Sequence, residues 1–534
     1  MPFIQPAPSL PHPYQADAAL KALLRRALAP ELLAEIEPSL AAMGDIALRM
    51  HALSLADRLN EPRHVPFDPW GNRVDRIEVT RLWQEAERVA AEQGLVALGC
   101  GPGACRLHQF ALVHLFHPSS DIYTCPLAMT DGAAQTLLRS GNQALLERAL
   151  PHLTSRDPAS FWTSGQWMTE SSGGSDVGLG STEARLDEAG VWRLYGRKWF
   201  TSAAASQMAL VLARPQGNPP GGKGLALFYT ETRTEDGSRN GFTVNRLKDK
   251  LGTRKLPTAE LELEGMVALP VGALANGVRA MAPMLNVTRT WNAVTAASFL
   301  RRGLMLAQDY ARKRFAFGAL LADQPLHRDT LAGLEAEAQG AFQLAFHGAS
   351  CLGLAESGAG DEVLHRLLTP LVKLTTARQA VAGCSELLEC FGGAGYVEDT
   401  GLPVLLRDAQ VLSIWEGTTD VLSLEAMKAM TSCGFAAFRA HVEAVLEGTG
   451  SGDLAGPALA VRTALARAEA WWAGAEEAGA RRFALTLGRT LALALLVRQA
   501  QWALDREQDP APSSAAARFA AHGVDRLHGV IGPK

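Results

Sequence analysis

Cysteine is scarce and scattered in this 534-residue chain. There are seven cysteines, an odd number, and none of them stands in a Cys-x-x-Cys pair. This pattern argues against a disulfide framework and predicts a reducing, cytoplasmic location. His114 and His117 stand three residues apart, but no Cys or carboxylate accompanies them at the spacing of a zinc ligand set, so the sequence predicts no metal site.

Long hydrophobic runs and an excess of one charge sign are missing as well. The apolar run LALALLV at 491–497 is far shorter than the ~20 residues of a membrane-spanning helix. The first residues lack the basic start and apolar core of a signal peptide, and we therefore expect no membrane association. The net charge of -4 gives no chain-wide sign of nucleic-acid binding, which depends on clustered Lys and Arg.

Aromatic residues are only 7% of the chain, whereas alanine is abundant, which favours helices. One block differs, because its short apolar runs are separated by Gly, Pro, Asn and Asp, and because AELELEG at 259–265 alternates as a half-buried strand does. The sequence therefore predicts a mainly α fold with a central β domain. The expected segments are a helical domain at 1–165, a β domain at 166–275, a helical bundle at 276–434 and an extra helical tail at 435–534.

Two polar stretches of the β domain are candidates for ligand binding. Residues 168–176, MTESSGGSD, are rich in glycine and hydroxyl groups, and glycine lets backbone N–H groups approach a ligand. The alternative is an ordinary capped loop. In residues 197–201, RKWFT, Trp199 beside Thr201 could flank a planar ring, although a strand tryptophan more often belongs to a core.

Two further stretches lie in the bundle segment. Residues 312–318, RKRFAFG, followed by Gln324, could hold phosphate, or could simply place cations at a helix C-terminus, where they offset its dipole. In SIWEGTTD at 413–420, Glu416 lies among apolar and small residues. A carboxylate there suits a general base, and helix capping is the alternative.

In this order, the four stretches resemble the acyl-CoA dehydrogenase family. The matching patterns are MTExxGGSDV, KWFT, RxxFGxxxxxQ, FGGxGY and WEGT, and KDKLGTR at 248–254 and CPLAMTDGAA at 125–134 are similar too. The resemblance covers about residues 80–430. The long N-terminal segment, the wording of the motifs and the tail look most like the AidB (alkylation-response) branch.

The resemblance implies a helical domain, a β-barrel-like middle domain and a helical bundle, assembled as a homotetramer with non-covalent FAD between the β domain and the bundle. Trp199 and Thr201 would lie at the flavin ring. Ser175 and Arg289 would contact the acyl-CoA substrate, and an electron-transfer protein would reoxidise the flavin. By residue match, the positions implied to bind FAD are Met168, Thr169, Ser175, Trp199, Thr201, Arg314, Phe317, Gln324, Glu389, Gly393 and Thr418.

Glu416 matches the catalytic carboxylate of the family. The resemblance implies that it removes the α-proton of the thioester while the β-hydride passes to the flavin, giving a trans-2-enoyl-CoA. Some members carry the base on another helix, beside the arginine that matches Arg289, but the neighbour here is Thr288. Two departures stand out: Trp167 replaces a small residue before the flavin loop, and Glu389 stands where many members have Gln.

The AidB likeness also implies an alternative function, a DNA-associated flavoprotein with weak or residual dehydrogenase activity in the alkylation response. Weak duplex DNA binding by the tail would need several phosphate contacts from one positive face. The tail has ten arginines and one lysine against ten acidic residues, a net charge of +1, with Arg481, Arg482, Arg489 and Arg498 as candidates. We therefore expect the tail to act chiefly in folding and assembly.

Overall fold

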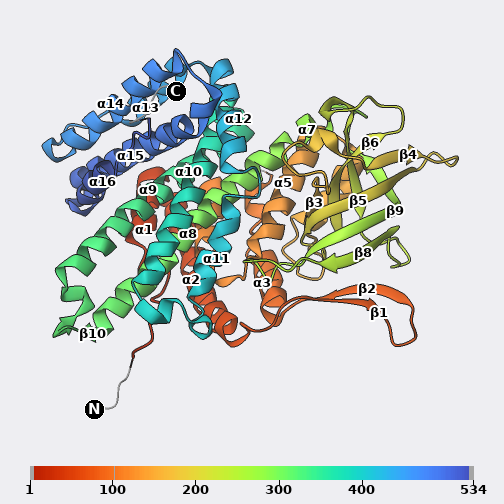
Figure 1. The fold of residues 1–534 in the computed structure, drawn as a ribbon, viewed down its shortest axis with the longest axis horizontal. Coiled ribbons are helices and arrows are strands. Elements are labelled where there is room, and N and C mark those ends of the chain that lie inside the picture. Colours follow the sequence, from red (N-terminus) through yellow and green to blue (C-terminus); the bar gives the residue numbers. More distant parts are fainter. Residues whose placement is uncertain (1–4, 102, 528–534) are drawn as a thin grey trace. The chain divides into compact units, whose positions relative to one another are not determined.

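The computed structural model describes residues 5–101 and 103–527, and it confirms the predicted fold class, mainly helical with a central β domain (Figure 1). The chain forms two compact units, each built from several segments. We call them the helical unit and the sheet unit. The helical unit comprises Met1–Arg49, Arg106–Pro118 and Arg289–Lys534, and the sheet unit comprises Met50–Cys105 and Ser119–Thr288. The segment boundaries expected from the sequence stay predictions.

The sheet unit contains a seven-stranded sheet in the order β3-β6-β4-β5-β9-β7, with β8 paired to β9. An additional pairing between β6 and β7 closes five of the strands into a ring, as in a barrel. Most pairs are antiparallel, whereas β6 runs parallel to β3 and β4. The strands are β3 (Ser164–Trp167), β4 (Glu183–Leu186), β5 (Trp192–Ser202), β6 (Met208–Pro215), β7 (Ala226–Glu231), β8 (Phe242–Leu247) and β9 (Thr258–Pro270).

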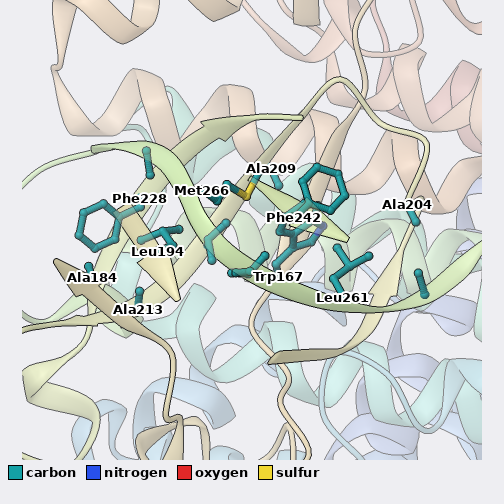
Figure 2. Close-up of a cluster of buried hydrophobic side chains, with 14 of the residues drawn as sticks. Trp167, Ala184, Leu194, Ala204, Ala209, Ala213, Phe228, Phe242, Leu261 and Met266 are labelled. Carbon is teal, nitrogen blue, oxygen red and sulfur yellow. The ribbon is translucent and has the colours of Figure 1, made fainter. Parts of the chain in front are cut away.

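The core of the sheet follows the alternation seen in the sequence. Leu261 and Leu263 of β9 are buried, whereas Glu262 is half-buried and Glu264 is exposed. Glu260 departs from the alternation, because it is buried and pairs with Lys248 at 2.6 Å. Figure 2 shows Trp167 inside this core, where its ring meets Phe242 edge to face at 5.7 Å. The unusual tryptophan before the flavin loop is therefore a core residue. The unit also holds helices α3 (Arg81–Glu92), α5 (Thr124–Ser140), α6 (Gln143–Leu153) and α7 (Gly277–Ala280), and a hairpin of β1 (Arg63–Phe67) and β2 (Arg73–Glu78).

The helical unit is built around long helices that lie side by side, α9 against α10, α10 against α12, and α15 against both α9 and α12 (Figure 1). Helix α10 ends at Glu389, three residues before the pair Gly392 and Gly393, and glycine is common just past the end of a helix. The main helices are α8 (Ala282–Lys313), α9 (Pro325–Glu356), α10 (Glu362–Glu389), α11 (Pro403–Leu412), α12 (Thr419–Cys433), α13 (Phe435–Val445), α14 (Ala455–Trp472), α15 (Ala480–Glu507) and α16 (Ala511–Ala521). The N-terminal part of the chain adds α1 (Ala18–Ala27), α2 (Pro30–Ala56) and α4 (Arg106–Phe116).

The tail packs into the helical unit through α15. Its leucines Leu487, Leu491 and Leu495 are fully buried. Arg489, 5% exposed, makes two hydrogen bonds to the carboxylate of Glu337 on α9, at 2.9 and 3.0 Å. Burial raises the pKa of Glu337, but the hydrogen bonds and charge of Arg489 outweigh it and lower that pKa to about 2. The pair joins the tail to the bundle at neutral pH.

Among the described residues, one helical stretch, Glu477–Glu507, is long and apolar enough by length and composition to cross a membrane. Within this stretch, 89% of the most apolar window is buried inside the structure. Burial of this extent is typical of a core helix.

We predict that Arg489→Gln lowers the free energy of unfolding of the helical unit by about 3 kcal/mol, because it leaves the half-buried Glu337 carboxylate without its cation. Arg482→Gln, an exposed change on the same helix, should cost no more than about 0.5 kcal/mol. Urea unfolding of both variants at pH 7 measures the difference. Equal stability of the two variants would show that the pair does not join the tail to the bundle.

Candidate active site

In the sheet unit, two of the sequence motifs are held together by a buried ion pair. Lys198, fully buried, places its Nζ 2.8 Å from Glu170 Oε1 and donates a second hydrogen bond to the carbonyl of Leu212. The Trp199 N–H also donates to the carbonyl of Thr169, at 2.9 Å. These contacts join the loop 168–176 to strand β5.

Glu170 is satisfied at both carboxylate oxygens. Oε2 accepts from the N–H and hydroxyl of Ser181, and Oε1 accepts from the hydroxyl of Thr182 at 2.6 Å, in addition to Lys198. Burial alone would raise the pKa of Glu170, but the charge of Lys198 and these hydrogen bonds lower it to about 2. The carboxylate is therefore ionised at neutral pH and anchors the start of the loop.

The residues implied to bind flavin in this unit differ in exposure. Ser175 lies in the exposed run 171–176, in which Gly173 adopts a φ of 120°. Met168 and Thr169 are half-buried. The ring of Trp199 is half-buried, with the ammonium of Lys248 3.4 Å from its centroid.

Thr201 is placed differently from its neighbours. Its side chain is fully buried, and its hydroxyl donates to the carbonyl of Ala259 on the paired strand β9, at 2.6 Å. The hydroxyl proton is therefore engaged within the sheet, and the oxygen keeps only its acceptor lone pairs for another partner. The role of Thr201 at a flavin ring stays a prediction.

In the helical unit, Glu416 lies in a turn between α11 and α12. Both Glu416 and Gly417 have positive φ angles, 55° and 100°. Such a conformation costs a non-glycine residue energy and persists only where the surroundings enforce it. Thr418 then begins α12 as its N-cap, its hydroxyl accepting from the N–H of Val421.

The surroundings of this turn are two cations that bind its backbone. The Nζ of Lys373, a fully buried residue of α10, donates to the carbonyls of Trp415 at 2.7 Å and Gly417 at 2.6 Å. The Nε of Arg289 donates to the carbonyl of Glu416 at 3.2 Å. Three successive carbonyls are thus satisfied by charged donors, which explains how the strained conformation is maintained.

Side-chain contacts complete the support. The indole Nε1 of Trp415 donates to Asn292 Oδ1 of α8 at 2.5 Å, and the terminal nitrogens of Arg289 bind both carboxylate oxygens of Glu425 at 2.7 and 2.9 Å. Arg289, implied to bind substrate, thus already has a structural role in this unit. Burial lowers the pKa of Lys373 to about 7, although the charge of Glu416 acts in the opposite direction.

The remaining implied flavin residues come from two segments of the helical unit, 314–324 and 389–393, and several of them are exposed. Phe317, 99% exposed, stands at the tip of the hairpin of β10 (Phe315–Ala316) and β11 (Ala319–Leu320). Gln324 follows this hairpin and donates to the carbonyl of Ala316, and Arg314 precedes it. Glu389 and Gly393 are also exposed.

Sequence reasoning overlooked the supporting residues Lys198, Lys373 and Asn292 as determinants of the site. Lys373 carried a usable signal, because it is a single charge in the otherwise apolar and small-residue run TPLVKLTTA. A lysine in such a run must find oxygen partners when the helix is buried. Among the described residues, no group of three or more His, Cys, Asp or Glu side chains could hold a metal ion.

Comparison with known families matches almost the whole chain. The matching descriptions are the AidB N-terminal domain over residues 6–158, the acyl-CoA dehydrogenase middle domain over 165–266, the acyl-CoA dehydrogenase C-terminal domain over 275–431 and an acyl-CoA dehydrogenase 11 C-terminal domain-like region over 434–524. The chain belongs to the acyl-CoA dehydrogenase family, as its motifs predict, and it is an oxidoreductase that acts in acyl-CoA dehydrogenation.

Individual relatives span the chain. Acyl-CoA dehydrogenase family member 11 of Caenorhabditis elegans is 41% identical over 93% of this chain and 85% of its own length, and a putative acyl-CoA dehydrogenase AidB of Escherichia coli is 30% identical over 70% of each. The crystal structure of Caenorhabditis elegans ACDH-11 in complex with C11-CoA matches 98% of this chain and 93% of its own, with a TM-score of 0.94 and 39% identity. The apo form of Bd2924 matches 93% of this chain and 99% of its own, with a TM-score of 0.87 and 43% identity.

We predict that Lys198→Met destabilises the sheet unit by about 3–5 kcal/mol, because Glu170 would be left as a buried, unpaired charge. The double variant with Glu170→Gln removes both charges and should recover part of that loss. Thermal unfolding of the two variants and the wild type measures this. A double variant less stable than the single variant would contradict the assignment of the pair.

We also predict that Lys373→Met keeps the fold of the bundle but lowers kcat on the order of 10²-fold, because the carboxylate of Glu416, which the motif resemblance implies is the catalytic base, would lose its geometry. Lys428→Met, an exposed change on α12, is the control and should leave kcat unchanged. Because the pKa of Lys373 is about 7, the pH profile of kcat should lose one ionisation near pH 7 in Lys373→Met. An unchanged pH profile would show that Lys373 does not position the base.

Proposed function

We propose that the protein is a FAD-dependent acyl-CoA dehydrogenase in which Glu416 is the catalytic base. The observation that carries this proposal is the turn that bears Glu416, a strained conformation maintained by Lys373 and Arg289. Helix capping, the alternative role considered for Glu416, is performed by Thr418 instead. A glutamate whose strained backbone is held by two buried cations is more typical of a functional residue than of a helix cap.

The residues present fit FAD. The run 171–176 is exposed and rich in hydroxyls and glycine, so its backbone and side chains are available to a polar ligand. The partly exposed ring of Trp199 offers a flat apolar surface of the kind that a flavin ring contacts. We propose that Met168, Thr169, Ser175, Trp199 and Thr201 hold FAD without a covalent bond. Arg314, Phe317, Gln324, Glu389, Gly393 and Thr418 are proposed as further contacts.

The contacts around Glu416 suit it to remove a proton from a thioester. The α-proton of a thioester is weakly acidic, so a carboxylate must be aligned with it and kept from water. In this chain, Lys373 and Arg289 bind the backbone on both sides of Glu416, which orients the carboxylate before substrate enters. Bound FAD would accept the β-hydride, which no side chain can do. The product is then a trans-2-enoyl-CoA.

The partners are proposals too. We propose an acyl-CoA substrate, and C11-CoA, bound by the similar ACDH-11, is the first acyl chain to test. Ser175 is proposed to contact it, with Arg289 acting through the base turn. The exposure of Phe317, Glu389 and Gly393 supports contacts with neighbouring subunits of a homotetramer. An electron-transfer protein as acceptor and a cytoplasmic location complete the proposal.

The structure gives little support to the DNA-associated alternative. Of the tail arginines that could form a positive face, Arg489 is buried against Glu337, and Arg481 pairs with Asp420 at 2.9 Å. Arg498 is only partly exposed. Arg482 is exposed, but non-specific DNA binding relies on several phosphate contacts from one positive face, so this arrangement favours the dehydrogenase proposal. Duplex DNA affinity measured as a function of salt tests this alternative.

We predict that Glu416→Gln retains FAD but loses on the order of 10²–10⁴-fold of dehydrogenase activity, because the amide keeps the shape and removes the base. Anaerobic bleaching of the flavin by C11-CoA measures the chemical step. Glu447→Gln, an exposed change in the tail, is the matched control. Bleaching by Glu416→Gln at the wild-type rate would refute the assignment of the base, and a wild-type protein that cannot bind FAD would refute the function.

A further inference from the structure

Four helices of the helical unit bring nitrogen-bearing side chains together, away from the turn of Glu416. Arg26 comes from α1, His347 from α9, His441 from α13 and Arg498 from α15. The Nε2 atoms of His347 and His441 lie 2.9 Å apart, and Arg26 donates to the amide oxygen of Gln499 at 2.6 Å. We call these four residues the basic cluster.

The basic cluster is cationic, and no Asp or Glu of residues 5–101 and 103–527 forms a recorded ion pair with it. Burial lowers the pKa of Arg26 to about 10, and the charge of Arg498 lowers it further. His347 has its pKa lowered by burial and by His441, Arg498 and Arg26. Among the described residues, the charged and titratable groups that act on the members of the cluster are each other and the thiol of Cys351, and none is an Asp or Glu.

Two acidic residues close in sequence to members of the cluster are engaged elsewhere. Glu507 accepts from Arg25 at 2.6 Å, and Glu443 lies 3.4 Å from the Nε of Arg462. Two donors of the cluster region are buried without a hydrogen-bond partner in the described part of the chain, Nε of Arg498 and Nε2 of Gln499. Native proteins satisfy nearly all buried donors, so these two unsatisfied N–H groups indicate that a hydrogen-bond acceptor binds here.

We propose that the basic cluster is a binding site for a small phosphate-class oxyanion, at the place where the tail helices meet the bundle. An oxyanion would bring a negative charge to the cationic cluster. Its oxygen atoms would also accept hydrogen bonds from the two unsatisfied donors. Guanidinium groups are well suited to this task, because their planar N–H donors match the oxygens of phosphate. The site uses no residue of the proposed dehydrogenase chemistry.

A metal ion or thiol chemistry fits the same residues less well. His347, Cys351 and His441 are metal-ligand types, but two neighbouring arginines repel a cation. Burial raises the pKa of the Cys351 thiol to about 11, so the thiolate that would bind a metal or act as a nucleophile is scarce at neutral pH. The positive charge of the cluster therefore favours binding of an anion over binding of a metal cation.

Binding should be linked to protons through the two histidines. Among the described residues, Arg26, Arg498 and Cys351 act on the two histidines, and Gln343 and Gln499 bind Arg26. None of these groups is negatively charged at neutral pH. Since the pKa values of both histidines are lowered in the fold, the unfolded chain binds more protons below about pH 6.5, and stability falls as pH falls through that value. A bound oxyanion favours the protonated rings, so its affinity should rise as pH decreases.

The test is calorimetric titration of the full-length protein with inorganic phosphate, in sulfate-free buffer of constant ionic strength and with saturating CoA present. We expect one saturable site per chain and a matching rise in the unfolding temperature. Sulfate, which keeps its charge on acidification, should bind more tightly at pH 6 than at pH 7.5. Glycerol 3-phosphate in place of phosphate shows whether the site admits the phosphate group of a metabolite or only the free ion.

Variants on one helix provide the control. Arg498→Gln should weaken phosphate binding about tenfold or more, whereas Arg506→Gln, an exposed change on α15, should not. His441→Gln should weaken binding and remove most of its pH dependence, and it serves if Arg498→Gln does not fold. Absence of saturable binding, competition by CoA, or equal losses in Arg498→Gln and Arg506→Gln would each overturn the proposal.

Discussion

Buried ammonium and guanidinium groups, and the need to surround them with oxygen atoms, are the constraint on which the candidate site depends. A cation removed from water is stable only where carbonyls or carboxylates replace its hydration. Lys198 meets this need with Glu170 and the carbonyl of Leu212, and Lys373 meets it with the carbonyls of Trp415 and Gly417. Each lysine thereby connects segments that are distant in sequence.

The two buried lysines differ in the partners that replace their hydration, and this difference predicts different effects of their removal. Lys198 has a carboxylate partner, so its removal leaves a buried charge and should be expensive in stability. Lys373 binds neutral carbonyls around a strained turn, so its removal should mainly change the orientation of Glu416. Glu170 and Lys198 therefore act as structural supports within the sheet unit, whereas Lys373 supports the turn of Glu416, the proposed base.

In the basic cluster, the described residues do not supply enough oxygen atoms for the partly buried arginines. Arg489 of α15 finds Glu337, but Arg498, a few turns further along the same helix, has two histidines, another arginine and a thiol around it. Nothing in the alanine-rich tail sequence distinguishes these two arginines, since both stand in apolar surroundings. Their different environments arise from which helix of the bundle each one faces.

Local patterns were enough to predict the family, the order of helical and β segments, and the positions of the motifs, because glycine-rich loops, alternating strands and WEGT-type motifs can be read over a few residues. The sequence also predicted the inward-facing leucines of β9, Leu261 and Leu263. The tertiary structure alone decided that Lys198 pairs with Glu170, that Lys373 and Arg289 bind the turn of Glu416, and that Thr201 donates within its sheet. These contacts join positions up to 127 residues apart, and no local pattern encodes which of many buried groups will meet once the helices and strands have packed.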